Sequence, residues 1–304
     1  MTDTLFDATL EVARELDITK EGYATSGEDG PPITLIDTID RTEPDDYWNG
    51  GTCWLTYDSA GAGAAPTGSF STIATWDFDL NKATMRIAPH EILSATPASG
   101  DGYAFGKRRY PLSRLITAVN YALNDLGDIP ISDISTITTA ANQTEYDLPQ
   151  AASTDLRKVY IQTNIPTDTN DYKWMEIHNW KVHKSATGSV DKLITPAQYD
   201  AGRLIKIVYV DTHANLRAAT DEIDDIVHLD RVVMSATLWA LNWYRGKTFS
   251  NRRALLDKIE RYEKKVAEAE ITHPIDYPMR TGDIMITGIG SYTSDFTPGT
   301  VSLK

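Results

Sequence analysis

Residues 110–127 of this chain read YPLSRLITAVNYALNDLG and carry a clear helical pattern. The apolar residues recur at the i, i+3, i+4 and i+7 positions of one buried helix face. Pro111 suits a first helical turn because its missing N–H group costs nothing there, and Gly127 suits the position just after a helix. The expected buried face consists of Leu112, Leu115, Ile116, Val119, Leu123 and Leu126.

Three further stretches also have helical patterns. Residues 4–16 begin with Thr4 and Asp7, which match a capping box with Asp in place of Glu. Residues 229–244 are apolar nearly all round, which predicts a central and buried helix. A last helix is expected after a cap at Ser250. Its predicted apolar stripe is Leu255, Ile259, Tyr262, Val266 and Ala269.

Two regions of β pattern separate these helices. Residues 33–105 contain short runs of β-forming residues, such as 52–57 and 71–76, with glycine-rich turns between them. This pattern predicts a small barrel or sandwich. Further strands are expected at residues 158–161, 174–177 and 203–209.

We therefore predict an α+β fold that is a discontinuous helical bundle with two inserted β modules and an extended C-terminal arm. The bundle would be built from residues 1–20, residues 107–128 and a closing helical pair, residues 221–271. The β modules would be residues 33–105 and 129–212, and the C-terminal arm residues 272–304.

The composition is that of a folded chain long enough to bury a sizeable core. Its 304 residues are 41% hydrophobic and 24% charged. No apolar run approaches the roughly 20 residues of a membrane span, and the first residues have no basic or apolar signal pattern. We expect no membrane association and no signal peptide. With Cys53 as the single cysteine, no intrachain disulfide is possible.

The formal charge of −14 argues against a surface that binds nucleic-acid phosphates. The acidity keeps a soluble protein dispersed, or it lines a channel through which DNA passes without binding. One compact basic cluster, Lys107, Arg108 and Arg109, precedes the helix at 110–127. This cluster is either solubilising charge or a clamp on an acidic surface of a neighbouring subunit.

The sequence predicts no catalytic, cofactor or metal site. Of the six histidines, only His178 and His183 are close in sequence, and on one regular strand their odd separation places them on opposite faces. Cys53 lies in a strand-like run beside Trp54, with no histidine nearby in sequence. We expect it to be a small buried hydrophobic residue.

The C-terminal arm is rich in Gly, Thr, Ser and Pro, but it also carries spaced apolar residues that linkers lack. It is either a frayed terminus or a segment that docks on a partner. Residues 283–287 alternate well enough to add a strand to the edge of a partner's sheet. The candidate docking residues are Tyr277, Met279, Ile284, Ile286, Tyr292 and Phe296.

Residues 107–271 resemble the head–tail connector (adaptor) proteins of tailed bacteriophages. The resemblance is carried by residues 110–128, YPLSRLITAVNYALNDLGD, which look like the opening helix of these proteins. Weaker similarities lie at residues 146–149, 156–161, 174–182 and 202–209, followed by a closing helical pair rich in Ala and Trp.

The resemblance implies a non-enzymatic virion protein, assembled in the host cytoplasm, that forms a ring beneath the portal. Such rings are commonly twelvefold, surround the DNA channel and bind a tail or neck protein on the other side. The arm often docks on the portal. Two alternatives stay open: a tail or neck ring further from the portal, and a carbohydrate-binding or adhesion module that uses Tyr47, Trp48, Trp54 and Trp76.

Overall fold

The computed structural model describes residues 3–30, 33–39, 41–61, 66–79, 82–87, 93–164, 172–185, 190–248 and 252–287. The chain divides into two compact units, each made of two separate stretches of sequence. Unit 1 contains residues 1–127 and 212–275, and unit 2 contains residues 128–211 and 276–304. No helix in the described ranges is both long and apolar enough to cross a bilayer.

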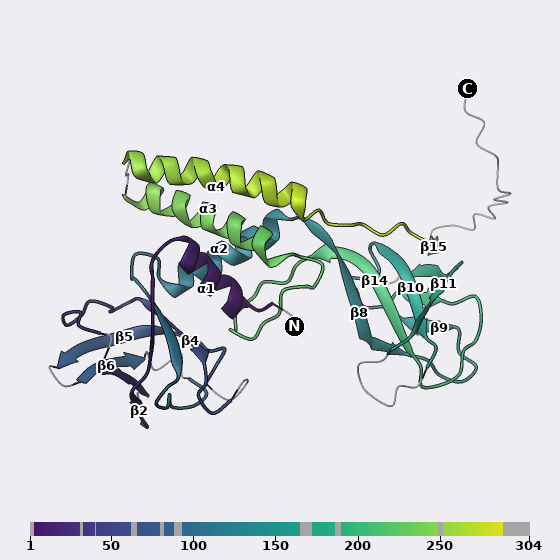
Figure 1. The fold of residues 1–304 in the computed structure, drawn as a ribbon. Helices are drawn as coiled ribbons and strands as arrows, with labels where there is room; N and C mark the ends of the chain where they lie inside the picture. The colour runs from purple at the N-terminus through teal and green to yellow at the C-terminus, as the bar shows by residue number, and fades with distance from the viewer. Residues whose placement is uncertain are drawn as a thin grey trace. The chain divides into compact units, whose positions relative to one another are not determined.

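The helices described in unit 1 pack on one another (Figure 1). α3 contacts α1, α2 and α4, and α1 also contacts α2, as the apolar faces in the sequence require. Thr4 and Asp7 form the predicted capping box of α1, and Gly127 follows α2 with a φ of 71°. The helices are α1 (Leu5–Glu15), α2 (Leu112–Asp125), α3 (Leu229–Thr248) and α4 (Arg253–Thr272).

The strands of unit 1 form a seven-stranded sheet with the order β1-β7-β4-β5-β6-β3-β2. Every described pairing in it is antiparallel. β7 is the last strand of this region in the sequence, and it lies between β1, the first strand, and β4. The strands are β1 (Thr19–Tyr23), β2 (Ser26–Glu28), β3 (Thr34–Asp37), β4 (Thr52–Tyr57), β5 (Phe70–Asp79), β6 (Lys82–Ile87) and β7 (Gly102–Gly106).

Aromatic side chains fill the core of this sheet. The rings of Trp48, Trp76 and Tyr103 each lie within 6 Å of the Phe105 ring, centroid to centroid. Trp54 is also fully buried, and its indole N–H donates to the Thr9 hydroxyl on α1 at 3.1 Å. This hydrogen bond ties the sheet to the helices, so the two are parts of one compact unit.

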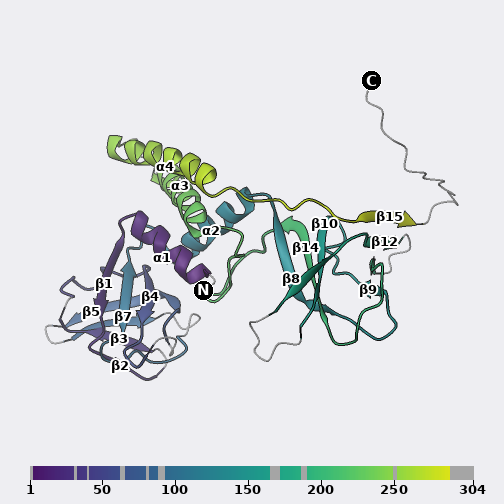
Figure 2. The same ribbon diagram turned by 45° about the vertical axis from the view of Figure 1, so that its right-hand side comes forward.

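Unit 2 contains two four-stranded sheets, with the orders β11-β10-β14-β8 and β15-β12-β13-β9. β15 comes from the end of the described chain and pairs parallel with β12 (Figure 2). The strands are β8 (Asp128–Thr138), β9 (Glu145–Asp147), β10 (Leu156–Gln162), β11 (Trp174–Ile177), β12 (Lys181–Ser185), β13 (Lys192–Ile194), β14 (Leu204–Thr212) and β15 (Asp283–Thr287).

The predicted fold class is wrong: the chain is not a helical bundle with inserted β modules. The protein is mostly β-sheet, with the four helices as the smaller part of its regular structure. Sequence periodicity identified both kinds of element but gave no measure of which kind forms the body. Which kind of element forms the body depends on strand pairings between distant residues, such as Thr19 with Gly106. No local sequence pattern encodes such a pairing.

The expected burial of α3 is only partial. Val232, Val233 and Ala236 are buried, whereas Leu238 and Trp239 are only half-buried. The neighbouring helices cover only part of its surface, and the Trp239 ring lies 5.9 Å from that of Tyr121, which is 52% exposed. The expected cap Ser250 lies outside the described residues, and the N-cap of α4 is Arg252.

Candidate functional site: a basic and aromatic pocket

The basic cluster predicted from the sequence lies beside two cavities of unit 1. The first, of about 650 Å³, is formed where α1 ends, α2 is about to begin, α3 ends and α4 begins. The second, of about 800 Å³, is lined by Lys107, Arg108 and Lys247 and by the acidic pair Asp45 and Asp46. Arg109, Tyr244 and Thr248 line both cavities.

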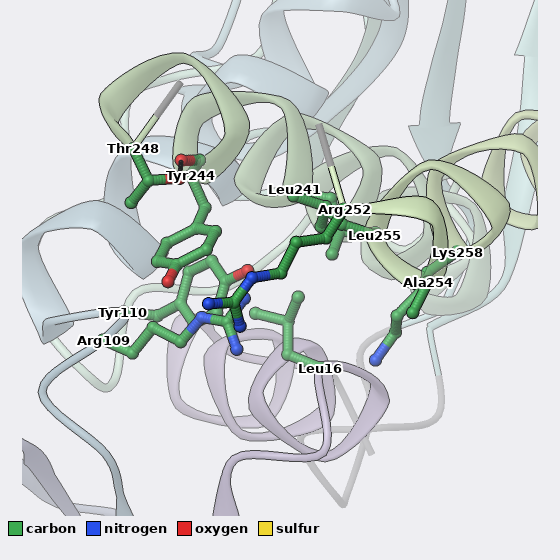
Figure 3. A pocket seen from close by; sticks show the side chains of 10 residues that line it. All are labelled: Leu16, Arg109, Tyr110, Leu241, Tyr244, Thr248, Arg252, Ala254, Leu255 and Lys258. Carbon is green, nitrogen blue, oxygen red and sulfur yellow. Dashed lines mark hydrogen bonds between the residues drawn. The ribbon is translucent and has the colours of Figure 1, made fainter. Parts of the chain in front are cut away.

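We call the first cavity the Arg109 pocket. Its charged side chains are cationic, and Figure 3 shows those of Arg109 and Arg252 extending toward its middle. The complete lining is Leu16, Arg109, Tyr110, Leu241, Tyr244, Thr248, Arg252, Ala254, Leu255 and Lys258.

Aromatic rings hold the cations of this region in place. The guanidinium carbon of Arg109 lies 3.7 Å from the centroid of the Tyr244 ring and 5.5 Å from that of Tyr110. The Lys247 ammonium lies 5.0 Å from the Trp243 ring centroid. A cation over an aromatic face is attracted to it without losing its charge. These cations are therefore positioned while still able to pair with an anion.

The electrostatics of the Arg109 pocket favour an incoming negative charge. Burial, together with the neighbouring Arg109 and Arg261, lowers the pKa of Lys258, although Asp17 and Glu15 act to raise it. Within the described ranges, no carboxylate lies within 4 Å of the charged groups of Arg109, Arg252 or Lys258. A bound carboxylate or phosphate would relieve this excess of positive charge.

Tyr110 contributes a neutral donor to the same pocket. Burial raises the pKa of its hydroxyl to about 12, although the Arg109 guanidinium acts to lower it. The phenol therefore keeps its proton near neutral pH and offers an O–H group to an anion. The pocket thus combines the donors and charges of an anion-recognition site.

The candidate docking residues of the C-terminal arm fall into three groups. Tyr277 is half-exposed and its hydroxyl donates to the Asp128 carbonyl at 2.7 Å, while Met279 is 84% exposed. Ile284 and Ile286 lie in β15, which pairs with β12 of the same chain. Tyr292 and Phe296 lie outside the described residues. The edge expected from a partner's sheet is thus supplied by the chain's own β12, and docking on a partner stays a prediction.

The segment before β15 is held on unit 2 by specific contacts. The Thr281 N–H donates to the Arg157 carbonyl at 3.0 Å, and the Trp180 indole N–H donates to the Thr281 hydroxyl at 3.2 Å. Arg280 forms an ion pair with Asp155. Gly282 lies directly against the Trp180 ring, where an added Cβ would come within 2.3 Å of it. The part of the arm that begins at Asp276 therefore belongs to unit 2.

Three of the four aromatic residues that suggested an adhesion module belong to the core. Trp48, Trp54 and Trp76 are fully buried, and only Tyr47, at 43%, is exposed. Cys53 is fully buried as predicted, and burial raises the pKa of its thiol.

One group of polar residues was missed from the sequence. His228, Asp230 and His273 come together although 45 positions separate the two histidines. A signal was present: His228 directly precedes one helix and His273 directly follows the next.

The chain as a whole matches no protein-family model and no curated protein, so its function has to be inferred from its own residues.

Proposed function

We propose that this protein is a non-enzymatic structural component of a tailed-phage virion, a connector that forms a ring between the portal and the tail. The proposal rests on the resemblance carried by residues 107–271 and on one structural observation. That observation is the Arg109 pocket, a cationic site on a chain whose net charge is −14.

A chain of this charge repels other copies of itself unless opposite charges meet at a specific surface. The Arg109 pocket offers such a surface, because its three cations have room for an acidic side chain from outside. Aromatic residues with exposed faces, such as Tyr121 beside Trp239, add apolar area of the kind that interfaces use.

An acidic complement lies at the other end of α1. Asp221 and Ile223 are tied to the start of α1 by backbone hydrogen bonds with Leu5 and Asp3. This acidic segment, residues 221–225, carries the exposed side chains of Glu222 and Asp225. The Arg109 pocket includes Leu16, just beyond the end of the same helix, and 11 helical residues span roughly 16 Å.

Because the two surfaces lie at opposite ends of α1, they suit contact between two copies of the chain. A head-to-tail contact of this kind closes into a ring when its rotation fits a whole number of subunits. We infer that the Arg109 pocket of one subunit receives Glu222 or Asp225 of the next. The remaining negative charge would let DNA pass along the channel without specific binding.

The portal and a tail or neck protein are the proposed neighbours of such a ring. A ring further from the portal, in the tail or neck, would use the same contact between subunits. The two placements differ in the partner that the ring retains, and a pull-down with isolated portal protein separates them.

A charge-reversal experiment tests the contact between subunits. Arg109→Glu places a negative charge in the pocket and is expected to shift the oligomer toward monomer, as measured by mass photometry across a range of concentrations. Lys181→Glu is the matched control, because it makes the same change in net charge at an exposed site on β12. The charge swap Arg109→Glu with Glu222→Arg is expected to restore part of the oligomer.

Two results would count against the proposal. One is a wild-type chain that stays monomeric at every concentration and is not retained by portal, tail or neck protein. The other is an equal effect of Arg109→Glu and Lys181→Glu, which would assign the loss of assembly to net charge rather than to the pocket.

A further inference from the structure

The pairing of α3 and α4 brings together two histidines that lie far apart in the sequence. Each helix has 20 residues, and the two pack against each other along the chain's only described helical hairpin. Helices of equal length joined by a short loop begin and end at the same level. His228, directly before α3, and His273, directly after α4, must therefore meet.

The side chains at this end of the hairpin lie close enough to share one ion. The imidazole rings of His228 and His273 are stacked, with centroids 3.7 Å apart and planes 10° from parallel. The Asp230 carboxylate lies 3.8 Å from His228 Nδ1. Each of the three residues offers one ligand atom, and these atoms all lie within 4.8 Å of one another.

The backbone at this site is fixed. The Arg231 guanidinium donates to the His273 carbonyl at 3.2 Å, and the His273 N–H donates to the Ala269 carbonyl at 2.9 Å. His228 and Asp230 are exposed side chains on that fixed backbone. Rotation about their side-chain bonds can therefore adjust the ligand distances while the helices stay in place.

The chemistry of the two histidines suits metal binding. The Asp230 N–H donates to His228 Nδ1 at 3.3 Å, so this nitrogen accepts in the structure, through the lone pair that a metal ion would use. Neutral imidazole is the form that coordinates a metal ion.

We propose that His228, Asp230 and His273 bind a divalent transition-metal ion, zinc, with water completing its coordination. Two nitrogens and one carboxylate oxygen match zinc, whereas calcium and magnesium prefer all-oxygen ligand sets. Tetrahedral zinc with bonds of about 2.1 Å requires ligand atoms roughly 3.4 Å apart, so small side-chain movements complete the site.

The bound ion would join the residue before α3 to the residue after α4. It would thereby hold the end of α4 just before the chain continues into unit 2 at Asp276. The site is separate from the Arg109 pocket, which contains the opposite ends of both helices.

The test uses the full chain, prepared without a histidine tag and freed of metal by a chelator. Titration with zinc chloride in a calorimeter is expected to show one ion per chain, and zinc is expected to raise the melting temperature. His273→Ala is expected to weaken zinc binding at least tenfold. Loss of a residue that only hydrogen-bonds to a metal ligand already weakens binding about tenfold or more, and His273 is itself a proposed ligand. His178→Ala, at a side chain that is 65% exposed in unit 2, is the matched control and is expected to bind zinc as the wild type does.

A second readout uses cobalt, whose visible absorption is intense when four ligands, here three from the protein and one water, surround it tetrahedrally. The wild type is expected to give this absorption and His273→Ala to lose it while keeping its metal-free melting temperature. Equal zinc affinity in the wild type and His273→Ala would overturn the proposal, as would a wild type that takes up no zinc.

Discussion

The two compact units of this protein complete their cores in different ways. Unit 1 has an aromatic core and a buried ionic network, and its seven strands all lie within residues 19–106. Unit 2 has a core of mainly aliphatic residues around Trp180, and one of its two sheets receives β15, residues 283–287, as a strand beside β12. Unit 1 therefore depends on interior groups, whereas unit 2 depends on a segment that has to arrive from a distant part of the sequence.

The two units differ most clearly in how far their ion pairs are buried. In unit 1, Arg41 and Asp37 are 1% and 0% exposed, and both contact the Tyr103 hydroxyl. The Arg41 guanidinium also donates to the carbonyls of Lys20 and Glu21. The ion pairs described in unit 2, such as Lys158 with Glu176 at 25% and 24% exposure, keep contact with water.

The largest effect is therefore expected from Asp37→Ala. The substitution leaves the Arg41 charge buried without its carboxylate, which costs about 3–5 kcal/mol when one partner of a buried pair is removed. Hydrogen exchange measured by mass spectrometry is expected to show faster exchange across residues 19–106 and unchanged exchange in unit 2. Asp37→Asn keeps an acceptor oxygen and is the control, with a smaller expected loss. Equal losses for the two variants would show that the carboxylate charge does not matter.

The sequence was informative where structure is local. The capping box at Thr4, the end of α2 at Gly127 and the buried stripe Leu255, Ile259 and Tyr262 were all predicted and are all present. These features depend on residues within a few positions of one another, so periodicity and cap chemistry suffice to find them.

The sequence was uninformative where distant residues decide. It predicted a strand at residues 283–287 but not its pairing with β12, because one strand pattern fits any free sheet edge. It placed the basic cluster beside a helix but did not reveal that Tyr244 and Lys258 complete a pocket around Arg109. It gave α3 an apolar surface without indicating which side its neighbours leave half-covered.

A second prediction concerns the segment of unit 2 that leads into β15. In Gly282→Ala, the new Cβ would come within 2.3 Å of the Trp180 ring and within 2.5 Å of the Trp180 carbonyl oxygen. Since that backbone cannot move aside cheaply, the segment has to shift, at a cost of about 1–3 kcal/mol for an overpacked site. Faster hydrogen exchange is expected in β12 and β15, with unit 1 unchanged.

The matched control for this prediction is Gly246→Ala in α3. There the added Cβ meets no atom within 4 Å, and alanine favours a helix over glycine by about 0.5–1 kcal/mol. The control is therefore expected to be neutral or slightly stabilising. If Gly282→Ala were equally harmless, the close contact with Trp180 would not be what holds the segment in place.

The smallest effect is expected from pH acting on the helices of unit 1. The Glu15 carboxylate, at the end of α1, accepts hydrogen bonds from the Tyr262 hydroxyl and, at 2.9 Å, from the Lys265 ammonium on α4. Burial acts to raise the pKa of Glu15, but these two hydrogen bonds outweigh it and hold the pKa below its usual value. A carboxyl whose pKa is lower in the folded state stabilises the fold above its unfolded pKa and loses that contribution as the pH falls through the folded value.

Glu15→Gln is therefore expected to flatten the pH dependence of unit 1. Between about pH 6 and pH 3, the wild type should lose more stability than the variant, because an unfolded glutamate titrates near 4.3 and the folded one below it. The Glu15 side chain is 31% exposed and that of Lys265 is 36% exposed, so solvent screening limits the difference to less than about 1 kcal/mol.

The measurement is the melting temperature of unit 1 at each pH, followed by hydrogen exchange in α1 and α4. Parallel pH profiles for the wild type and Glu15→Gln would mean that the α1–α4 contact rests on apolar packing alone.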